Sequence, residues 1–166
     1  NGDAALIEYA EILDGAELKQ VEVPGEEIAA AKKEVDEHLL VSLKIAADNI
    51  RNFHQRQRDT LPIGRTELGE GVGQILAPLE RVGVYAPGGT ASYPSTVLMT
   101  AIPARAAGVD EIILATPPKK DGRIPPLTLA AAEIAGVDRV FAIGGAPAIA
   151  GLAFGTESVP RVDKIC

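Results

Sequence analysis

The spacing of apolar residues changes near residue 80 of this chain. Before that point apolar and charged residues alternate with a helical period, whereas after it short apolar runs are separated by stretches rich in Gly, Pro and Ala. Apolar residues at every third or fourth position are typical of amphipathic helices, and continuous apolar runs are typical of buried strands. The pattern predicts two units: residues 1–80, a mostly helical segment, and residues 81–166.

The first unit opens with a predicted helix from Asp3, which we expect to cap it, to about Asp14, and Gly15 ends this helix. Residues 18–23 alternate between apolar and polar positions and predict a short strand, which the Pro-Gly pair at 24–25 ends. The chain therefore turns at least twice before its longest regular segment begins.

A long helix is predicted over residues 26–58, and a hairpin is one interpretation of the Gly- and Pro-rich residues 59–80. One apolar stripe of the helix must pack against something. The stripe consists of Leu39, Leu43, Ala46, Ile50 and Phe53. The apolar residues expected in the hairpin are Val72, Ile75 and Leu76.

The second unit alternates between apolar runs and helical stretches. The predicted strands are 82–86, 111–116, 139–143 and a beginning at 162–166, and the predicted helices are 94–107, 126–135 and 147–154. Such alternation indicates a parallel sheet with helical crossovers. The predicted fold class is α/β, with the helical segment followed by an incomplete Rossmann-like β-α-β domain. Because a core strand needs a continuation, we expect this domain to be truncated at its carboxyl end.

Composition narrows the classes of function. Sixteen Lys and Arg residues against 23 Asp and Glu give a net charge of −7, and the basic residues are scattered, which argues against binding to nucleic acid. No apolar run is long enough to span a membrane, and the first ten residues do not resemble a signal peptide. The one cysteine, Cys166, fits a reducing compartment, so we expect a cytoplasmic protein with no membrane partner.

Two glycine pairs follow predicted strands at equivalent positions, one in the run 85–90 (YAPGGT) and one in the run 144–147 (GGAP). In a parallel sheet ligands bind beyond the carboxyl ends of the strands, so both pairs are candidates for close approach to a ligand. Neither completes the G-x-G-x-x-G pattern, and the second strand ends in Thr-Pro-Pro where an acidic residue would be usual. Tight turns with close helix packing are the alternative.

The other polar candidates give no catalytic arrangement. Tyr85 is equally compatible with ligand contact and with packing, and His38 and His54 lack metal ligands at a suitable spacing. Cys166 has no activating partner and is expected to be a buried strand thiol. Single carboxylates are expected to serve solubility and helix capping, namely Asp110, Glu111, Asp121, Glu133 and Asp138.

Two long runs closely resemble histidinol dehydrogenases. They are residues 81–105 (RVGVYAPGGTASYPSTVLMTAIPAR) and 144–164 (GGAPAIAGLAFGTESVPRVDK), and the similarity extends to residues 1–6 and to Phe53-His54. The resemblance implies an enzyme that oxidises L-histidinol through the aldehyde to L-histidine with NAD and zinc, acting as a homodimer. The stripe between Leu39 and Phe53 is then a candidate for part of the dimer contact.

The resemblance also implies specific site residues. Tyr85 matches the NAD-contacting tyrosine of the family, and Pro87, Gly88 and Gly89 line the same turn. Pro147 stands where the family has an NAD-contacting glutamine, and proline offers neither a side-chain amide nor a backbone N–H. No residue of this sequence matches the zinc ligands or the catalytic histidine-glutamate pair of the family.

We therefore expect the chain to be a fragment of a histidinol dehydrogenase that does not turn over histidinol by itself. Two alternatives stay open. One is a non-catalytic binding or assembly module of the same fold, in which Pro147 reports the loss of cofactor binding. The other is a related NAD-dependent alcohol dehydrogenase with another small substrate.

Overall fold

Four parallel strands form the central sheet in the computed structural model, which describes residues 2–88 and 91–166. The strand order across the sheet is β5-β4-β3-β6. Their bounds are β3 (Arg81–Tyr85), β4 (Glu111–Thr116), β5 (Arg139–Ala142) and β6 (Lys164–Ile165). The α/β fold class is confirmed, and each of the four predicted strands is present with its end shifted by two residues or fewer.

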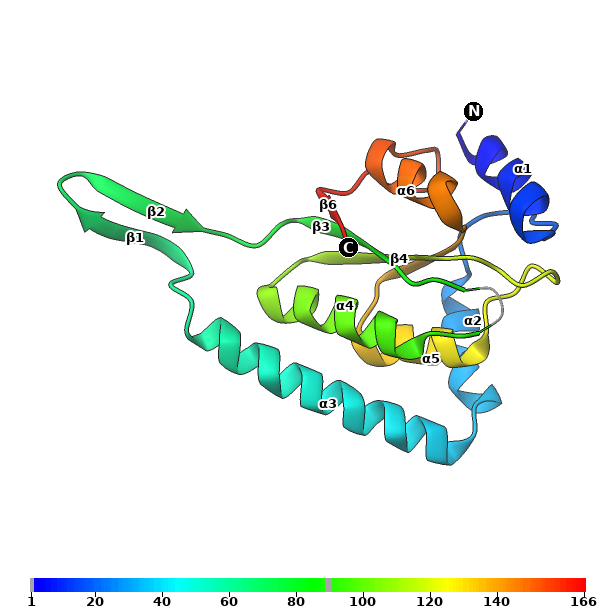
Figure 1. The fold of residues 1–166 in the computed structure, drawn as a ribbon, viewed down its shortest axis with the longest axis horizontal. Helices are drawn as coiled ribbons and strands as arrows, with labels where there is room; N and C mark the ends of the chain where they lie inside the picture. Colours follow the sequence, from blue (N-terminus) through cyan, green and yellow to red (C-terminus); the bar gives the residue numbers. More distant parts are fainter. Residues whose placement is uncertain (1, 89–90) are drawn as a thin grey trace.

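Helices cover both faces of this sheet (Figure 1). α4 (Pro94–Ala107) and α5 (Pro126–Ala135) lie on one face, and α6 (Gly145–Phe154) lies on the other with α1 (Asp3–Asp14) packed beside it. The chain steps outward from β3 to β4 to β5 and then crosses back to β6 on the other side of β3. The direction of winding therefore reverses between β3 and β6, and the crevice at such a point is where sheets of this kind bind ligands.

The core consists of two apolar clusters, one on each face of the sheet. Strand β4 contributes to both: Ile112 and Leu114 belong to the cluster under α4 and α5, whereas Ile113 and Ala115 belong to the cluster under α6. All four side chains are fully buried. Successive side chains of a strand point to opposite faces, so a strand covered on both faces must be apolar throughout.

The amino-terminal segment differs from its prediction in two details. Gly2, not Asp3, precedes the first turn of α1, and the Asp3 carboxylate instead accepts hydrogen bonds from Thr156 Oγ1 and from the Ser158 N–H. Residues 18–23 form no strand: a single antiparallel bridge joins Glu22 to Phe141 at the outer edge of β5. Only two backbone hydrogen bonds join this segment to β5, from Val23 N–H to the Val140 carbonyl and from Ala142 N–H to the Val21 carbonyl. They are too few to form a strand, but the segment still covers the open edge of the sheet.

The predicted helix over residues 26–58 is interrupted. It consists of α2 (Gly25–Ala30), a 3-10 turn η1 (Ala31–Glu34) and α3 (Glu37–Asp59). Val35 is extended, and the Asp36 carboxylate accepts hydrogen bonds from the N–H groups of His38 and Leu39. Asp36 thus caps a new helix. Its capping preference outweighs the helical spacing of apolar residues that continues through this position.

The predicted stripe of α3 is only partly buried. Leu43 and Ile50 pack against the core, but Leu39, Ala46 and Phe53 face outward, and Phe53 is 65% exposed. The fully buried residue of this helix is Ala47. The apolar surface of α3 is wider than the part that α4 and α5 cover, which is why a single stripe was the wrong description.

The hairpin is confirmed and consists of β1 (Gly64–Gly69) and β2 (Val72–Leu76), paired antiparallel. It projects away from the rest of the molecule as an arm (Figure 1). None of the helices within the described residues is long and apolar enough to cross a membrane. Both core clusters contain residues from before and after residue 80, and the division of the chain at that point stays a prediction.

Candidate functional site

Three loops meet beyond the carboxyl ends of β3, β4 and β5. Pro117, in the loop after β4, is buried between the loop after β3 and the loop after β5. A methyl group added at Gly88, after β3, would lie 2.7 Å from Cγ of Pro117. One added at Gly144, after β5, would lie 2.6 Å from Cβ of the same proline. Both distances are far below van der Waals contact, and the proline ring cannot rotate away.

Close packing therefore accounts for Gly88 and Gly144, as the alternative reading of the two glycine pairs expected. Gly89, the second glycine of the first pair and a candidate site residue, lies outside the described residues. Pro87 is exposed at the entrance of the same loop. The Thr-Pro-Pro segment at the end of β4 carries no acidic group. Its Pro117 packs between the Gly88 turn and the Gly144 turn and so sets the distance between them.

Gly145 is a glycine for a different reason. It is the first residue of α6 and has φ +60°, in the left-handed region that other residues adopt at a cost. An added methyl group would meet nothing closer than Cδ of Pro147 at 3.7 Å, so space does not restrict this position. Conformation selects glycine here, and the residue remains exposed at the surface.

Tyr85 connects the two turns. It is the half-buried last residue of β3, and its hydroxyl oxygen accepts a hydrogen bond of 3.0 Å from the N–H of Gly145. Its own backbone N–H donates to the carbonyl of Cys166 at 2.8 Å. Tyr85 therefore joins β3, the segment after β6 and the start of α6 at the place where the winding of the sheet reverses. The sequence showed that the turns were equivalent, but not that this phenol bridges them.

Pro147 lies in the first turn of α6 and is half-buried, as the tolerance of proline at a helix start allows. The first residues of a helix have N–H groups without partners inside the helix. Of the first three residues of α6, Gly145 donates to Tyr85 and Pro147 has no N–H. Ala146 is exposed, and its N–H lies between these two residues at the start of α6.

The end of α1 flanks the same turn. A methyl group at Gly144 would lie 3.1 Å from Oδ2 of Asp14, and one at Gly145 would lie 4.0 Å from Cδ1 of Leu13. Burial raises the pKa of the Asp14 carboxyl above its ordinary value. Asp14 is also the last residue of α1, where the helix dipole disfavours a negative charge.

Three of the five carboxylates expected to serve solubility and capping form ion pairs instead: Glu111 with Arg81, Glu133 with Lys32 and Asp138 with Arg105. Glu133 pairs with Lys32 at 2.9 Å, and Asp138 accepts from the Ile112 N–H at 2.7 Å as well as from Arg105. For these three the expectation of solubility and capping was wrong, whereas Asp121 accepts a hydrogen bond from the Arg123 N–H at 3.1 Å, as a capping carboxylate does.

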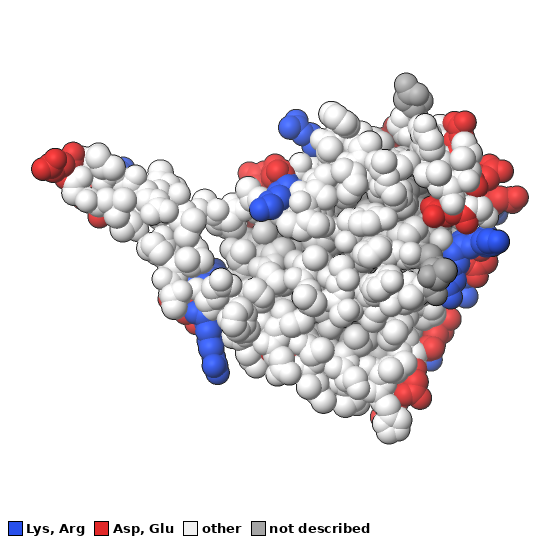
Figure 2. All heavy atoms as spheres, in the orientation of Figure 1, with Lys and Arg blue, Asp and Glu red and all other residues white. Residues whose placement is uncertain are grey.

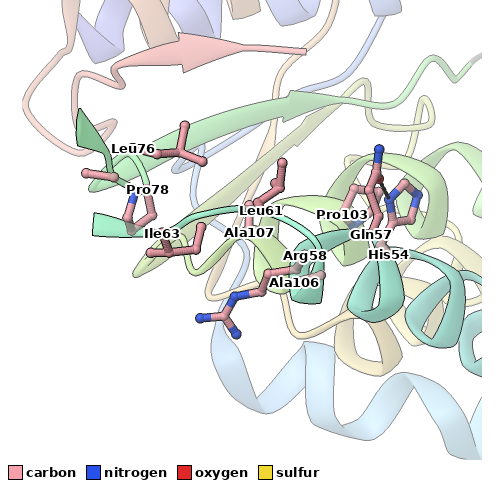
Figure 3. Close-up of a pocket in the computed structure, with 11 residues that line it drawn as sticks. His54, Gln57, Arg58, Leu61, Ile63, Leu76, Pro78, Pro103, Ala106 and Ala107 are labelled. Atoms are coloured by element: carbon pink, nitrogen blue, oxygen red, sulfur yellow. Dashed lines mark hydrogen bonds between the residues drawn. The ribbon is translucent and has the colours of Figure 1, made fainter. Parts of the chain in front are cut away.

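Two further sequence candidates have side chains that take no part in the contacts around Tyr85. Cys166 is exposed, not buried, because β6 is an edge strand that pairs with β3 alone. His54 contacts Gln57, with 3.0 Å between Nδ1 and Oε1, and lines an apolar hollow of about 160 Å³. Figure 3 shows this hollow where α3 and α4 meet the base of the hairpin. Within residues 2–88 and 91–166 no three His, Cys, Asp or Glu side chains are placed to hold a metal ion.

Comparison with known proteins decides the family. A family model described as histidinol dehydrogenase matches residues 1–166. The chain belongs to the histidinol dehydrogenase family. The resemblance of its two long runs is thereby confirmed.

Individual relatives of the histidinol dehydrogenase family agree. The chain is 56% identical over 165 residues to histidinol dehydrogenase of Methanosarcina mazei, with 99% of this chain and 38% of that protein covered. It is 56% identical to the protein of the same name from Dehalococcoides mccartyi, with 99% and 37% covered. The crystal structure of histidinol dehydrogenase from Elizabethkingia anophelis matches with a TM-score of 0.89 at 40% identity, covering 98% of this chain and 38% of that one.

The chain therefore spans well under half the length of these relatives. The structural match covers 98% of this chain, so its overall fold is that of the matching part of the Elizabethkingia anophelis structure. Family membership also assigns the chain to a family of oxidoreductases.

Proposed function

We propose that the carboxyl edge of the sheet binds NAD, with Tyr85 as the central contact and Pro87, Gly88 and Pro147 around it. The observation that carries this proposal is the position of Tyr85. It stands at the switch point between β3 and β6, and its hydroxyl reaches the first residue of α6. A phenol at that place combines an aromatic surface with a polar atom, which suits a nucleotide.

The chain contributes this scaffold to an enzyme that oxidises L-histidinol to L-histidine in the cytoplasm. NAD, when bound, supplies the hydride acceptor, and the role of these residues is to bind and orient it. Zinc is the other cofactor that the family implies. The described residues do not fit a zinc site, and we assign it no ligand in this chain. We expect the 166 residues by themselves to bind NAD without oxidising histidinol.

A homodimer is part of the same proposal. Figure 2 shows a broad face without Lys, Arg, Asp or Glu, which extends over α3 and α4 in the view of Figure 1. The outward residues of α3 include Leu39, Ile45 and Phe53, which are 50%, 58% and 65% exposed. An uncharged face lets two copies with a net charge of −7 approach each other without repulsion at the contact.

The NAD proposal is tested by titrating the chain with NADH and following nucleotide fluorescence, which is simple because the protein contains no tryptophan. We expect weak binding that Tyr85→Ala abolishes, since the substitution removes both the ring and the hydroxyl. Tyr9→Ala is the matched control, because Tyr9 is a half-exposed tyrosine on α1. An unchanged Kd in Tyr85→Ala would remove Tyr85 from the site.

The opposite change is expected at Pro147. Pro147→Gln restores an N–H and adds a side-chain amide at the start of α6, so it should tighten NADH binding about tenfold, the usual effect of one well-placed hydrogen bond. Ile149→Gln, an exposed position two residues further along α6, is the control. If Pro147→Gln leaves the Kd unchanged, the first turn of α6 does not contact the nucleotide.

A further inference from the structure

We propose that the Tyr85 hydroxyl is the positioning group of the site: by accepting the Gly145 N–H it fixes the Gly144-Gly145 turn in the shape that a ligand meets. The inference rests on the proposed function and adds a role for one atom. The ring of Tyr85 would contact the nucleotide, whereas the hydroxyl acts through α6 on the residues that follow it.

The turn needs such a group because its own residues supply only the bond that the Gly144 carbonyl accepts from Ala148, and no side chain anchors Gly145. The residue before α6 is Gly144, whose side chain cannot cap a helix, and no side-chain cap bond is present. Gly145 is exposed, has a positive φ and carries no side chain that could anchor it. Glycine has more backbone freedom than any other residue, so two glycines in succession make this helix start a flexible connection.

Pro117 fixes only one side of this turn. It packs against Gly144 and prevents the turn from moving inward, but the position of Gly145 is open, with no atom within 3.7 Å of an added methyl group. The bond from Gly145 to Tyr85 spans the remaining side. The turn is thus held by the contact with Pro117, by the bond to Tyr85 and by the first bond of α6, in which the Ala148 N–H donates to the Gly144 carbonyl at 3.3 Å.

Tyr85 is suited to this task because it is itself rigid. It ends a central strand, its backbone N–H is bonded to the Cys166 carbonyl, and its ring packs against the apolar cluster under α6. A hydroxyl presented from such a residue stays in one place. It therefore does for α6 what a Ser or Asp side chain does at an ordinary helix start, but it does so from another strand.

Ligand affinity depends on this contact because Ala146 and Pro147 directly follow the held residue. When the turn is fixed beforehand, a ligand does not have to order it on binding. When the turn is loose, part of the binding free energy is used for that ordering. Removing the hydroxyl alone should therefore weaken binding even though the aromatic surface remains.

The test is Tyr85→Phe, measured by amide hydrogen exchange of the ligand-free chain and by NADH titration. We expect exchange of the Gly145 amide to become about tenfold faster, as loss of one neutral hydrogen bond predicts, with unchanged exchange in β3 and β4. The Kd for NADH should rise about fivefold, less than in Tyr85→Ala. Tyr9→Phe is the control and should change neither quantity.

Two results would overturn the proposal: Gly145 exchange that Tyr85→Phe leaves unchanged, or faster exchange with an unchanged Kd. The second would show that the bond exists but does not serve binding. If the unsubstituted chain binds no NADH, the proposed function fails instead. Hydrogen exchange then still decides whether the hydroxyl holds the turn, so the two failures are distinguishable.

Discussion

The central sheet and the hairpin arm use similar residues in opposite surroundings. In β4 the side chains from Ile112 to Ala115 are completely buried, whereas in the arm Ile75 is 75% exposed and Leu68 is 65% exposed. The sheet is covered on both faces by helices, but β1 and β2 contact mainly each other. Apolar composition alone therefore does not identify where the folding free energy of this chain arises, because the hydrophobic effect depends on the area removed from water.

This difference separates two kinds of stability. The buried strands of the sheet fix the positions of the loops around Pro117. The candidate site is therefore rigid because the strands that lead into it are rigid. An isolated two-stranded hairpin is at best marginally stable in water. The arm consequently adds little to the stability of the folded chain, and changes in it should leave the site untouched.

The strongest way to test the comparison is to remove a core side chain. Phe141 of β5 is fully buried in the cluster under α6, with the Arg139 guanidinium 5.1 Å from its ring centre. Phe141→Ala should lower the free energy of unfolding by about 3–5 kcal/mol, because it removes a large apolar side chain and leaves a cavity. Urea unfolding followed by circular dichroism measures the loss. A loss below about 1 kcal/mol would mean that the sheet is not the main source of stability.

A smaller effect is expected where the sheet meets the site. Gly144→Ala places a methyl group 2.6 Å from Cβ of Pro117 and should cost about 1–3 kcal/mol through overpacking. Gly25→Ala is the control, since nothing lies within 4 Å of that position, and it should change stability by less than about 0.5 kcal/mol. Equal unfolding midpoints for the two variants would show that the loop at Gly144 yields, and Pro117 would then not set its spacing.

The α/β half of the chain could be predicted closely from the sequence because its signals are local and consistent. The runs 111–116 and 126–135 coincide with β4 and α5, since continuous apolar strands, prolines at helix starts and glycines at helix ends all indicate the same boundaries. The first half gave conflicting signals. A continuous helical period hid the break at Val35, and only the capping bonds of Asp36 reveal it.

The candidate site could be predicted only as a set of turns. Spacing placed Tyr85 and the two glycine pairs at equivalent strand ends, and family resemblance singled out Tyr85 and Pro147. The contacts that define the site are long-range: Pro117 against both glycines, Tyr85 with Gly145, and Asp14 beside Gly144. Such contacts follow from strand order, and strand order is not encoded in the local spacing of residues.

The smallest expected effect concerns the arm. Ile75→Ala should change the free energy of unfolding by less than about 0.5 kcal/mol, because the side chain is already in water. Ile113→Ala, the same substitution at a fully buried position of β4, should cost about 2–5 kcal/mol. Both are measured by urea unfolding at two protein concentrations tenfold apart. Ile75→Ala could instead lower the free energy of unfolding as much as Ile113→Ala does, and only at the higher protein concentration. That result would mean that the arm is buried between two chains in solution and is exposed only in the single chain.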